Sequence, residues 1–126
     1  MYCVKIMYPR RPGSSFVFNL KHWLDVHMPL GLGLFREQFG FSPLRVDCDV
    51  NCTGSGDEQA KYYVVSSLYF NNKNEADCFS KLFAIPEIAA KLKADWPNYT
   101  ELDPEVVFSE IIDVDPVSGM RISKGN

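Results

Sequence analysis

The order of apolar and polar residues along the chain predicts four strands and two helical regions. Residues 2–8 are rich in β-branched and aromatic side chains, and residues 44–51 alternate strictly between apolar and polar. Residues 61–70 are apolar on both faces of a strand, and a last strand is predicted over residues 106–114. Glycine- and proline-containing segments separate these runs.

The first helical region begins after Asn19, a residue type favoured at helix N-caps. Pro29 is expected to interrupt this helix, which would leave His27 at a helix C-terminus. The helical spacing then resumes and ends at Gly40. The apolar stripe comprises Leu20, Trp23, Leu24, His27 and Met28 before the proline, and Leu32, Phe35 and Phe39 after it.

The second helical region is expected to be capped by Asn74. Pro86 is expected to break or kink it, and Trp96-Pro97 to end it. Its apolar positions are Phe79, Leu82, Phe83, Ile88, Ala89 and Leu92.

The order β-α-β-β-α-β predicts an α+β, ferredoxin-like fold, in which a four-stranded antiparallel sheet carries both helices on one face. One domain is expected over residues 1–114, followed by a polar tail over residues 115–126. The strand at residues 61–70 is expected to place Tyr62, Val64, Ser66 and Leu68 on one face and Tyr63, Val65, Ser67 and Tyr69 on the other.

An apolar second face predicts a homodimer whose sheets cover each other, because soluble monomers rarely expose large apolar patches. The alternative is a central strand with incidental surface rings.

The composition and charge of the chain argue against several classes of function. The 126 residues are 46% hydrophobic with a net charge of −3, and they include nine Phe, six Tyr and two Trp. Scattered basic residues argue against nucleic acid as a partner. The sequence contains neither an apolar run long enough for a membrane helix nor the pattern of a signal peptide, which predicts a cytoplasmic protein without a membrane partner. Reduced, mostly buried thiols and no metal site are expected at Cys3, Cys48, Cys52 and Cys78.

His27 is the most informative candidate for chemistry, since its place on the apolar stripe directs it at the sheet. A buried imidazole beside a pocket can accept or donate a proton near neutral pH, whereas the alternative is a core histidine bonded to a backbone carbonyl. His22 lies off the stripe and is expected to point sideways or into solvent. Tyr99 and Trp96 are candidates for a pocket rim, and Trp23 for a cavity wall or ordinary core. The remaining candidates, with less weight, are Tyr8, Tyr63 and Tyr69.

The string Trp-Leu-Asp-Val-His-Met-Pro at residues 23–29, taken with Pro-Asn-Tyr-Thr at 97–100 and Phe-Ser-Glu-Ile at 108–111, resembles the EthD family over about residues 2–112. The resemblance implies a homodimer of the dimeric α+β barrel type, with a small-molecule cavity between helices and sheet. His27 and Tyr99 match the family's histidine and tyrosine, whereas Val107 stands where many members have glutamine. Relatives in the wider group include cofactor-free monooxygenases, isomerases and haem-degrading enzymes.

These observations together predict an enzyme of secondary or catabolic metabolism that acts on a hydrophobic aromatic or carbonyl-bearing molecule without a cofactor. The chemistry would be cofactor-free oxidation or proton transfer, as in an isomerase, dehydratase or cyclase, with His27 as acid and base. Tyr99 and Tyr69 would hydrogen-bond a substrate oxygen, and Trp23, Phe35 and Trp96 would form apolar walls. The first alternative is a non-catalytic protein that carries a hydrophobic ligand or assists a partner oxygenase. The second is a protein that binds haem through His27.

Overall fold

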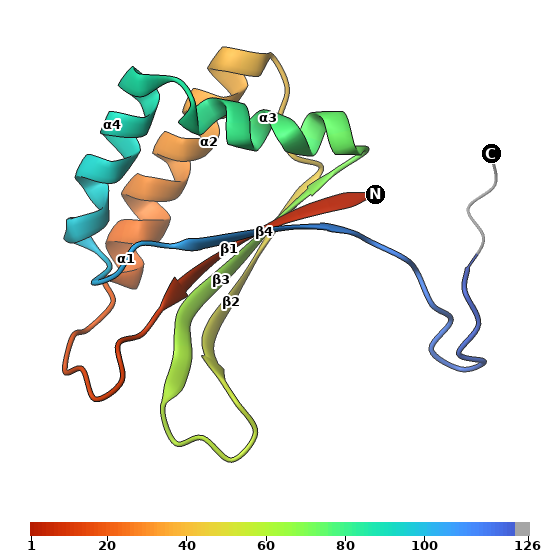
Figure 1. Cartoon of the computed structure of the whole chain (residues 1–126), viewed down its shortest axis with the longest axis horizontal. Helices are drawn as coiled ribbons and strands as arrows, with labels where there is room; N and C mark the ends of the chain where they lie inside the picture. The colour runs from red at the N-terminus through yellow and green to blue at the C-terminus, as the bar shows by residue number, and fades with distance from the viewer. Residues whose placement is uncertain (123–126) are drawn as a thin grey trace.

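The structure, a computed structural model, describes residues 1–122 and forms one sheet with a layer of helices (Figure 1). The strand order is β2-β3-β1-β4, and every neighbouring pair is antiparallel. The elements in chain order are β1 (Tyr2–Pro9), α1 (Leu20–His22), η1 (Trp23–His27), α2 (Met28–Phe39), β2 (Arg45–Thr53), β3 (Ala60–Phe70), α3 (Lys73–Phe83), α4 (Pro86–Asp95), η2 (Trp96–Asn98) and β4 (Glu105–Glu110).

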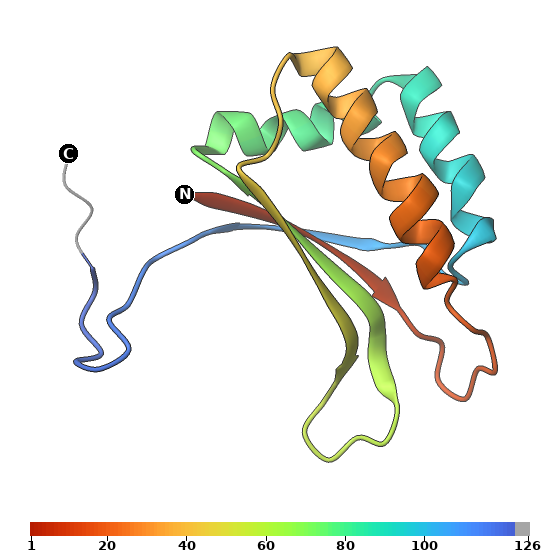
Figure 2. The same cartoon turned by 180° about the vertical axis from the view of Figure 1, so that it is seen from behind.

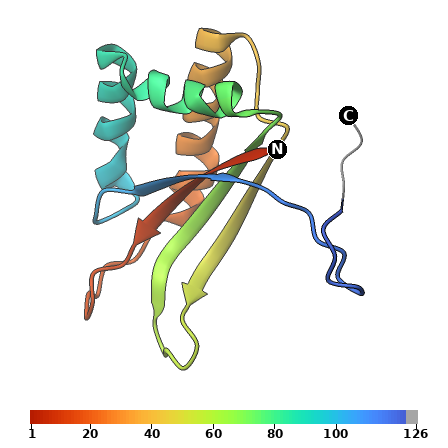
Figure 3. The same cartoon turned by 45° about the vertical axis from the view of Figure 1, so that its right-hand side comes forward.

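All the helices lie on one face of the sheet, and no segment of the described chain covers the other (Figures 1 and 3). The register places Val4 between Leu68 on β3 and Phe108 on β4. Val4 and Leu68 are buried beneath the helices together with Phe35 and Leu82. The predicted α+β, ferredoxin-like arrangement with its helices on one face is therefore confirmed.

A register shift between Tyr8 and Pro9 changes which side chains of β3 face the helices. Tyr8 pairs with Val64 and Pro9 pairs with Tyr62, so one extra residue of β3 is accommodated. Tyr63 and Val64 both join the helix-side core as a result. Strict alternation along β3, which put Tyr63 and Val64 on opposite faces, was therefore wrong at this bulge.

The first helical region continues through Pro29, so His27 lies within a helix and the predicted interruption was wrong. The helix is widened just before the proline, where the Met28 N–H bonds to the carbonyl of Trp23, five residues back. In a regular α-helix the ring of Pro29 would collide with the carbonyl of Asp25. The π-helical turn η1 relieves that collision and lets the chain run on to Gly40, which has the left-handed φ of +78°.

The second helical region is two helices. Asn72, and not Asn74, caps α3, since its side chain accepts a hydrogen bond from the Glu75 N–H. The break before Pro86 separates α3 from α4, as the sequence predicted. Pro86 occupies the first turn of α4, where a missing N–H costs nothing.

The chain leaves the sheet at Glu110, four residues earlier than the predicted end at Val114. Residues 111–122 extend away from the body and fold back through a bridge between Val114 and Arg121 (Figure 2). We call this segment the C-terminal arm. Its turn is held by Asp115, whose side chain accepts from the N–H groups of Val117 and Ser118. Hydrogen bonds therefore hold part of the segment predicted as a polar tail, and residues 123–126 of that tail lie outside the described part.

The four cysteines are free thiols, but only Cys3 is buried. Cys48 is exposed because it lies on the edge strand β2, so the expectation of mostly buried thiols was wrong. None of the helices in residues 1–122 combines the length and apolar character needed to cross a membrane.

Candidate functional site

A cavity of about 170 Å³ lies between the sheet and the helices. Its wall is apolar except at Tyr8, His27 and Ser66 and the edge of Trp96. The other lining residues are Ile6, Met28, Gly31, Leu32, Phe35, Leu68, Phe79, Leu82, Phe83, Leu92, Pro104 and Val106. An engineered apolar cavity of about 150 Å³ binds benzene, so a cavity of this size and lining has room for a small ring compound.

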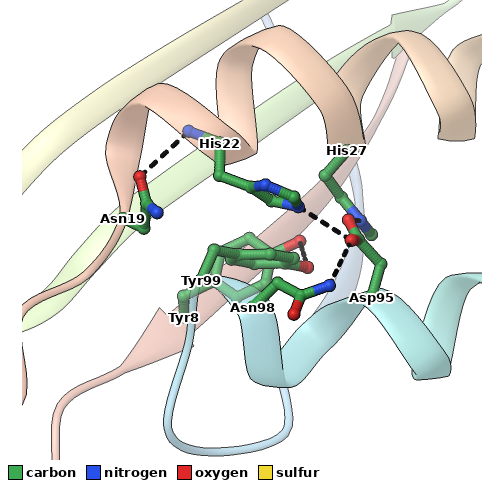
Figure 4. Close-up of polar contacts among 7 residues, drawn as sticks. All are labelled: Tyr8, Asn19, His22, His27, Asp95, Asn98 and Tyr99. Atoms are coloured by element: carbon green, nitrogen blue, oxygen red, sulfur yellow. Dashed lines mark hydrogen bonds and ion pairs between the residues drawn. The ribbon is translucent and has the colours of Figure 1, made fainter.

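A carboxylate connects two histidines beside this cavity (Figure 4). One oxygen of Asp95 lies 3.0 Å from Nδ1 of His27, and the other lies 2.8 Å from Nε2 of His22. The side-chain amide of Asn98 donates to the second oxygen at 3.0 Å. His27 and Asp95 are almost completely shielded from solvent, whereas His22 is partly exposed. The group therefore runs from the cavity wall towards the protein surface.

The π-helical turn explains why both histidines reach one carboxylate. His22 and His27 are five positions apart, and a regular α-helix would turn their side chains roughly 140° from each other, at about 100° per residue. Five residues make one hydrogen-bonded turn of a π-helix, so η1 brings them to the same side. Asp95 is the last residue of α4, which carries it across to this turn.

The hydrogen bond from His27 to Asp95 determines which ring nitrogen is basic. Burial lowers the pKa of His27 below its ordinary value, although Asp95 acts in the opposite direction, so the ring is neutral near pH 7. Burial would raise the pKa of Asp95, but hydrogen bonds from Asn98, His22 and His27 hold it low and the group stays ionised. A neutral ring that donates from Nδ1 carries its lone pair on Nε2. No residue of the described chain hydrogen-bonds Nε2, which leaves that lone pair free to accept a proton.

Two tyrosines form the neighbouring part of the site. Tyr99 is fully buried, its ring centroid lies 4.7 Å from that of His27, and its hydroxyl donates to the Tyr8 hydroxyl at 3.3 Å. Burial and the adjacent Tyr8 raise the pKa of Tyr99 far above its ordinary value, so Tyr99 keeps its proton. Because Tyr8 accepts from Tyr99 and also lines the cavity, its own proton is available to an acceptor in the cavity.

The structure brings together most of the site residues that the sequence singled out, but in different positions. His27, Phe35 and Trp96 line the cavity. Trp23 and Tyr99 lie behind Tyr8 in the aromatic core and do not line it. Tyr69 lies on the open face of the sheet, where the guanidinium carbon of Arg45 is 5.7 Å from its ring centroid.

Sequence reasoning missed Asp95 and Ser66 and directed His22 away from the site. Asp95 is an ordinary acidic residue in a polar helical turn, and only the tertiary contact distinguishes it. His22 was placed with α-helical geometry, so the widened turn made that prediction wrong. The available signal was the proline two residues after His27, which a continuous helix can accommodate only by a local change of pitch.

The low pKa of His27 predicts how stability depends on pH. Between the folded-state pKa and the unfolded value of about 6.5, the unfolded chain binds a proton that the folded chain does not. The free energy of unfolding should therefore fall as the pH drops through this window, by up to about 1.4 kcal/mol per pH unit for one proton. Urea unfolding of the wild type and of His27→Gln at pH 7.5, 6.0 and 5.0 measures it. The slope should be smaller in the variant, and equal slopes would contradict the assignment.

Among residues 1–122, no group of three or more His, Cys, Asp or Glu side chains has the arrangement of a metal site. The site is thus composed of a histidine supported by a carboxylate, a hydrogen-bonded tyrosine pair and an apolar wall.

The comparisons with known proteins agree with this architecture. The model of the EthD domain matches residues 11–103. An EthD-like protein from Ralstonia eutropha JMP134 is 17% identical, with 92% of this chain and 96% of that chain covered and a TM-score of 0.67. An ethyl tert-butyl ether D (EthD) family protein from Bacillus halodurans C-125 is 14% identical, with 88% and 98% covered and a TM-score of 0.55. None of the curated proteins compared with the chain matches it. Since the domain match spans most of the sequence and includes His22, His27, Asp95 and Tyr99, the chain belongs to the EthD family.

Proposed function

We propose that this protein is a cofactor-independent enzyme that binds a small, apolar ring compound bearing a carbonyl group and moves a proton at the carbon next to that carbonyl. The observation that carries the proposal is His27, which lines an apolar cavity while Asp95 holds its Nδ1 at 3.0 Å. This leaves Nε2 as a base, and Tyr8, whose hydroxyl accepts a hydrogen bond from Tyr99, is a second polar residue in the wall of the same cavity.

The proposed step balances with these groups alone. Nε2 of His27 takes a proton from the carbon beside the carbonyl, and the C–H electron pair becomes the enolate double bond while negative charge moves to the oxygen. The Tyr8 hydroxyl donates to that oxygen, and Asp95 stabilises the imidazolium. Return of the proton to another position is an isomerisation. In a dehydration, the His27 imidazolium instead gives its proton to a β-hydroxyl, which leaves as water while the enolate electrons form the new C=C bond and the carbonyl is restored.

The apolar wall of the cavity favours formation of the enolate, because it strengthens the hydrogen bond from Tyr8 to the enolate oxygen. In a cavity that excludes water, a hydrogen bond to a developing oxyanion is worth more than the same bond in water. The oxidation expected from the resemblance would need O₂ to take electrons from the same enolate, so proton abstraction comes first in either case. The cytoplasmic location and the metabolic context predicted from the sequence stay predictions.

The test is hydrogen exchange in 2-tetralone, a small apolar ring ketone that has exchangeable hydrogens beside its carbonyl. The compound is incubated with the protein in D₂O at pH 7.5, and loss of the proton signal beside the carbonyl is followed by NMR against a protein-free sample. Exchange that is faster than this background and saturates with 2-tetralone supports the enzyme. Saturable binding without faster exchange would contradict it and favour the carrier.

We also propose that two copies associate through the open face of the sheet and the C-terminal arm. Val107 on that face of β4 and Ile112, Val114 and Met120 on the arm are all exposed. Removing such side chains from water is the common driving force for a two-fold interface.

Sedimentation at about 10 µM is expected to give a dimer. A Val114→Asp/Met120→Asp variant should shift the mass towards the monomer, because each carboxylate would be desolvated in the interface. Val17→Asp is the control, since Val17 is also exposed but lies in the loop before α1. A monomeric wild type would contradict the proposal.

A further inference from the structure

We propose that Ser66 binds a second oxygen group of the ligand, so that the cavity selects ring ketones that also carry a hydroxyl or a second carbonyl. This inference rests on the proposed function and specifies its substrate class. Ser66 is 0% exposed, it borders the cavity, and its Oγ has no hydrogen-bond partner in the described chain. A buried hydroxyl without a partner destabilises a fold, and such groups are normally satisfied.

The residues next to Ser66 leave its hydroxyl without a hydrogen-bond partner. Along β3 the same face presents Val64 and Leu68. Across the sheet Ser66 pairs with Ile6 on β1 and with Cys48 on β2, and neither gives its Oγ a hydrogen-bond partner. An alanine at this position would fill nearly the same space without an unpaired polar atom. Packing therefore gives no reason for a serine here, whereas a ligand oxygen would supply the missing partner.

The register fixes where the second oxygen would lie relative to the first. Tyr8 pairs with Val64 and Ile6 pairs with Ser66, so Tyr8 and Ser66 are diagonal neighbours on the cavity face of two adjacent strands. Such residues have their Cα and Cβ atoms roughly 7–8 Å apart. A carbonyl held at Tyr8 and His27 therefore leaves Ser66 facing a more distant part of the same ring system.

A small ligand with two separated oxygen groups fits this arrangement. Serine both donates and accepts a hydrogen bond, so either a hydroxyl or a carbonyl can be recognised. A site that must pair a buried hydroxyl discriminates strongly against analogues that lack the partner atom, because the protein group is then left unsatisfied.

The test compares 2-tetralone with its four derivatives that carry one hydroxyl on the aromatic ring. Titration calorimetry measures the affinity of each for the wild type, Ser66→Ala and Ser67→Ala. Ser67 is the matched control, because it is also buried but lies on the opposite face of β3. At least one hydroxylated compound should bind the wild type about tenfold more tightly than 2-tetralone. Ser66→Ala should abolish that preference and leave the affinity for 2-tetralone unchanged, whereas Ser67→Ala should keep it.

The unliganded variants provide a second readout. If the hydroxyl serves the ligand, Ser66→Ala should unfold at a urea concentration equal to or above that of the wild type. A destabilised Ser66→Ala would assign the hydroxyl a structural role and overturn the inference. It would also be overturned if no hydroxylated compound were preferred, or if the preference persisted in Ser66→Ala. If neither 2-tetralone nor any of its four derivatives bound, both the inference about Ser66 and the proposed function would be contradicted.

Discussion

Replacing His27 by glutamine is expected to lower the rate of proton exchange in 2-tetralone by about 10²–10⁴-fold, because the amide cannot take up the proton. The affinity for 2-tetralone should change by less than about threefold, since glutamine is polar and similar in length and most of the cavity wall is apolar. NMR gives the exchange rate and calorimetry gives the affinity. An unchanged exchange rate would remove His27 from the mechanism.

The pH profile and a neighbouring variant separate the role of His27 from a general structural effect. The wild-type rate should rise with pH through a pKa below 6.5 and then level off, because burial lowers the pKa of His27 and only the neutral ring is a base. His22→Gln is the matched control, since His22 contacts the same carboxylate but does not line the cavity. It should retain exchange within about tenfold of the wild type, as expected for a group that acts through a hydrogen-bonded neighbour.

Tyr8→Phe is expected to lower the exchange rate by about 10²–10³-fold, the usual cost of removing one donor to a developing oxyanion. The change deletes one hydroxyl oxygen and keeps the ring in the aromatic core, where Tyr8 contacts Trp23 and Tyr99. The same NMR assay measures the rate, and urea unfolding confirms that the variant is folded.

Tyr99→Phe provides the comparison for Tyr8. Tyr99 does not line the cavity and reaches it only by donating to Tyr8, so its loss should slow exchange by about tenfold or less. Its fully buried hydroxyl has no described partner other than Tyr8. A larger effect in Tyr99→Phe than in Tyr8→Phe would reverse the two roles and return Tyr99 to direct contact with the substrate.

Local periodicity was enough to predict which side chains of the site are buried. The stripe that includes Trp23 and His27 placed both side chains on the buried side of a helix, and Phe35 followed on the same stripe into the cavity wall. The prediction ranked Tyr99 above Tyr8 as a pocket residue, because both are tyrosines in apolar surroundings and local periodicity does not distinguish them. Only the packing of the fold shows that Tyr8, and not Tyr99, lines the cavity.

Tyr69 shows the limit of alternation within a strand. Alternation correctly separated Tyr69 from Leu68, but it does not say which face carries the helices. The structure places Leu68 under the helices and Tyr69 on the open face beside Arg45. The choice of face is set by the crossing of helices over the sheet, which is a property of the whole chain.

The sequence by itself determined the order of elements, the family and the burial of His27, because each follows from spacing or from motifs within short segments. Tertiary structure decided the chemistry of that histidine. Asp95 is 68 residues from His27 in the chain, and the two meet only because α4 ends beside the widened turn η1. The pairing of Tyr8 with Tyr99 and the position of Ser66 beside a cavity likewise depend on which elements become neighbours. Hydrophobic periodicity records which side of an element is buried, but the partner a buried polar group meets is fixed only when distant segments pack together.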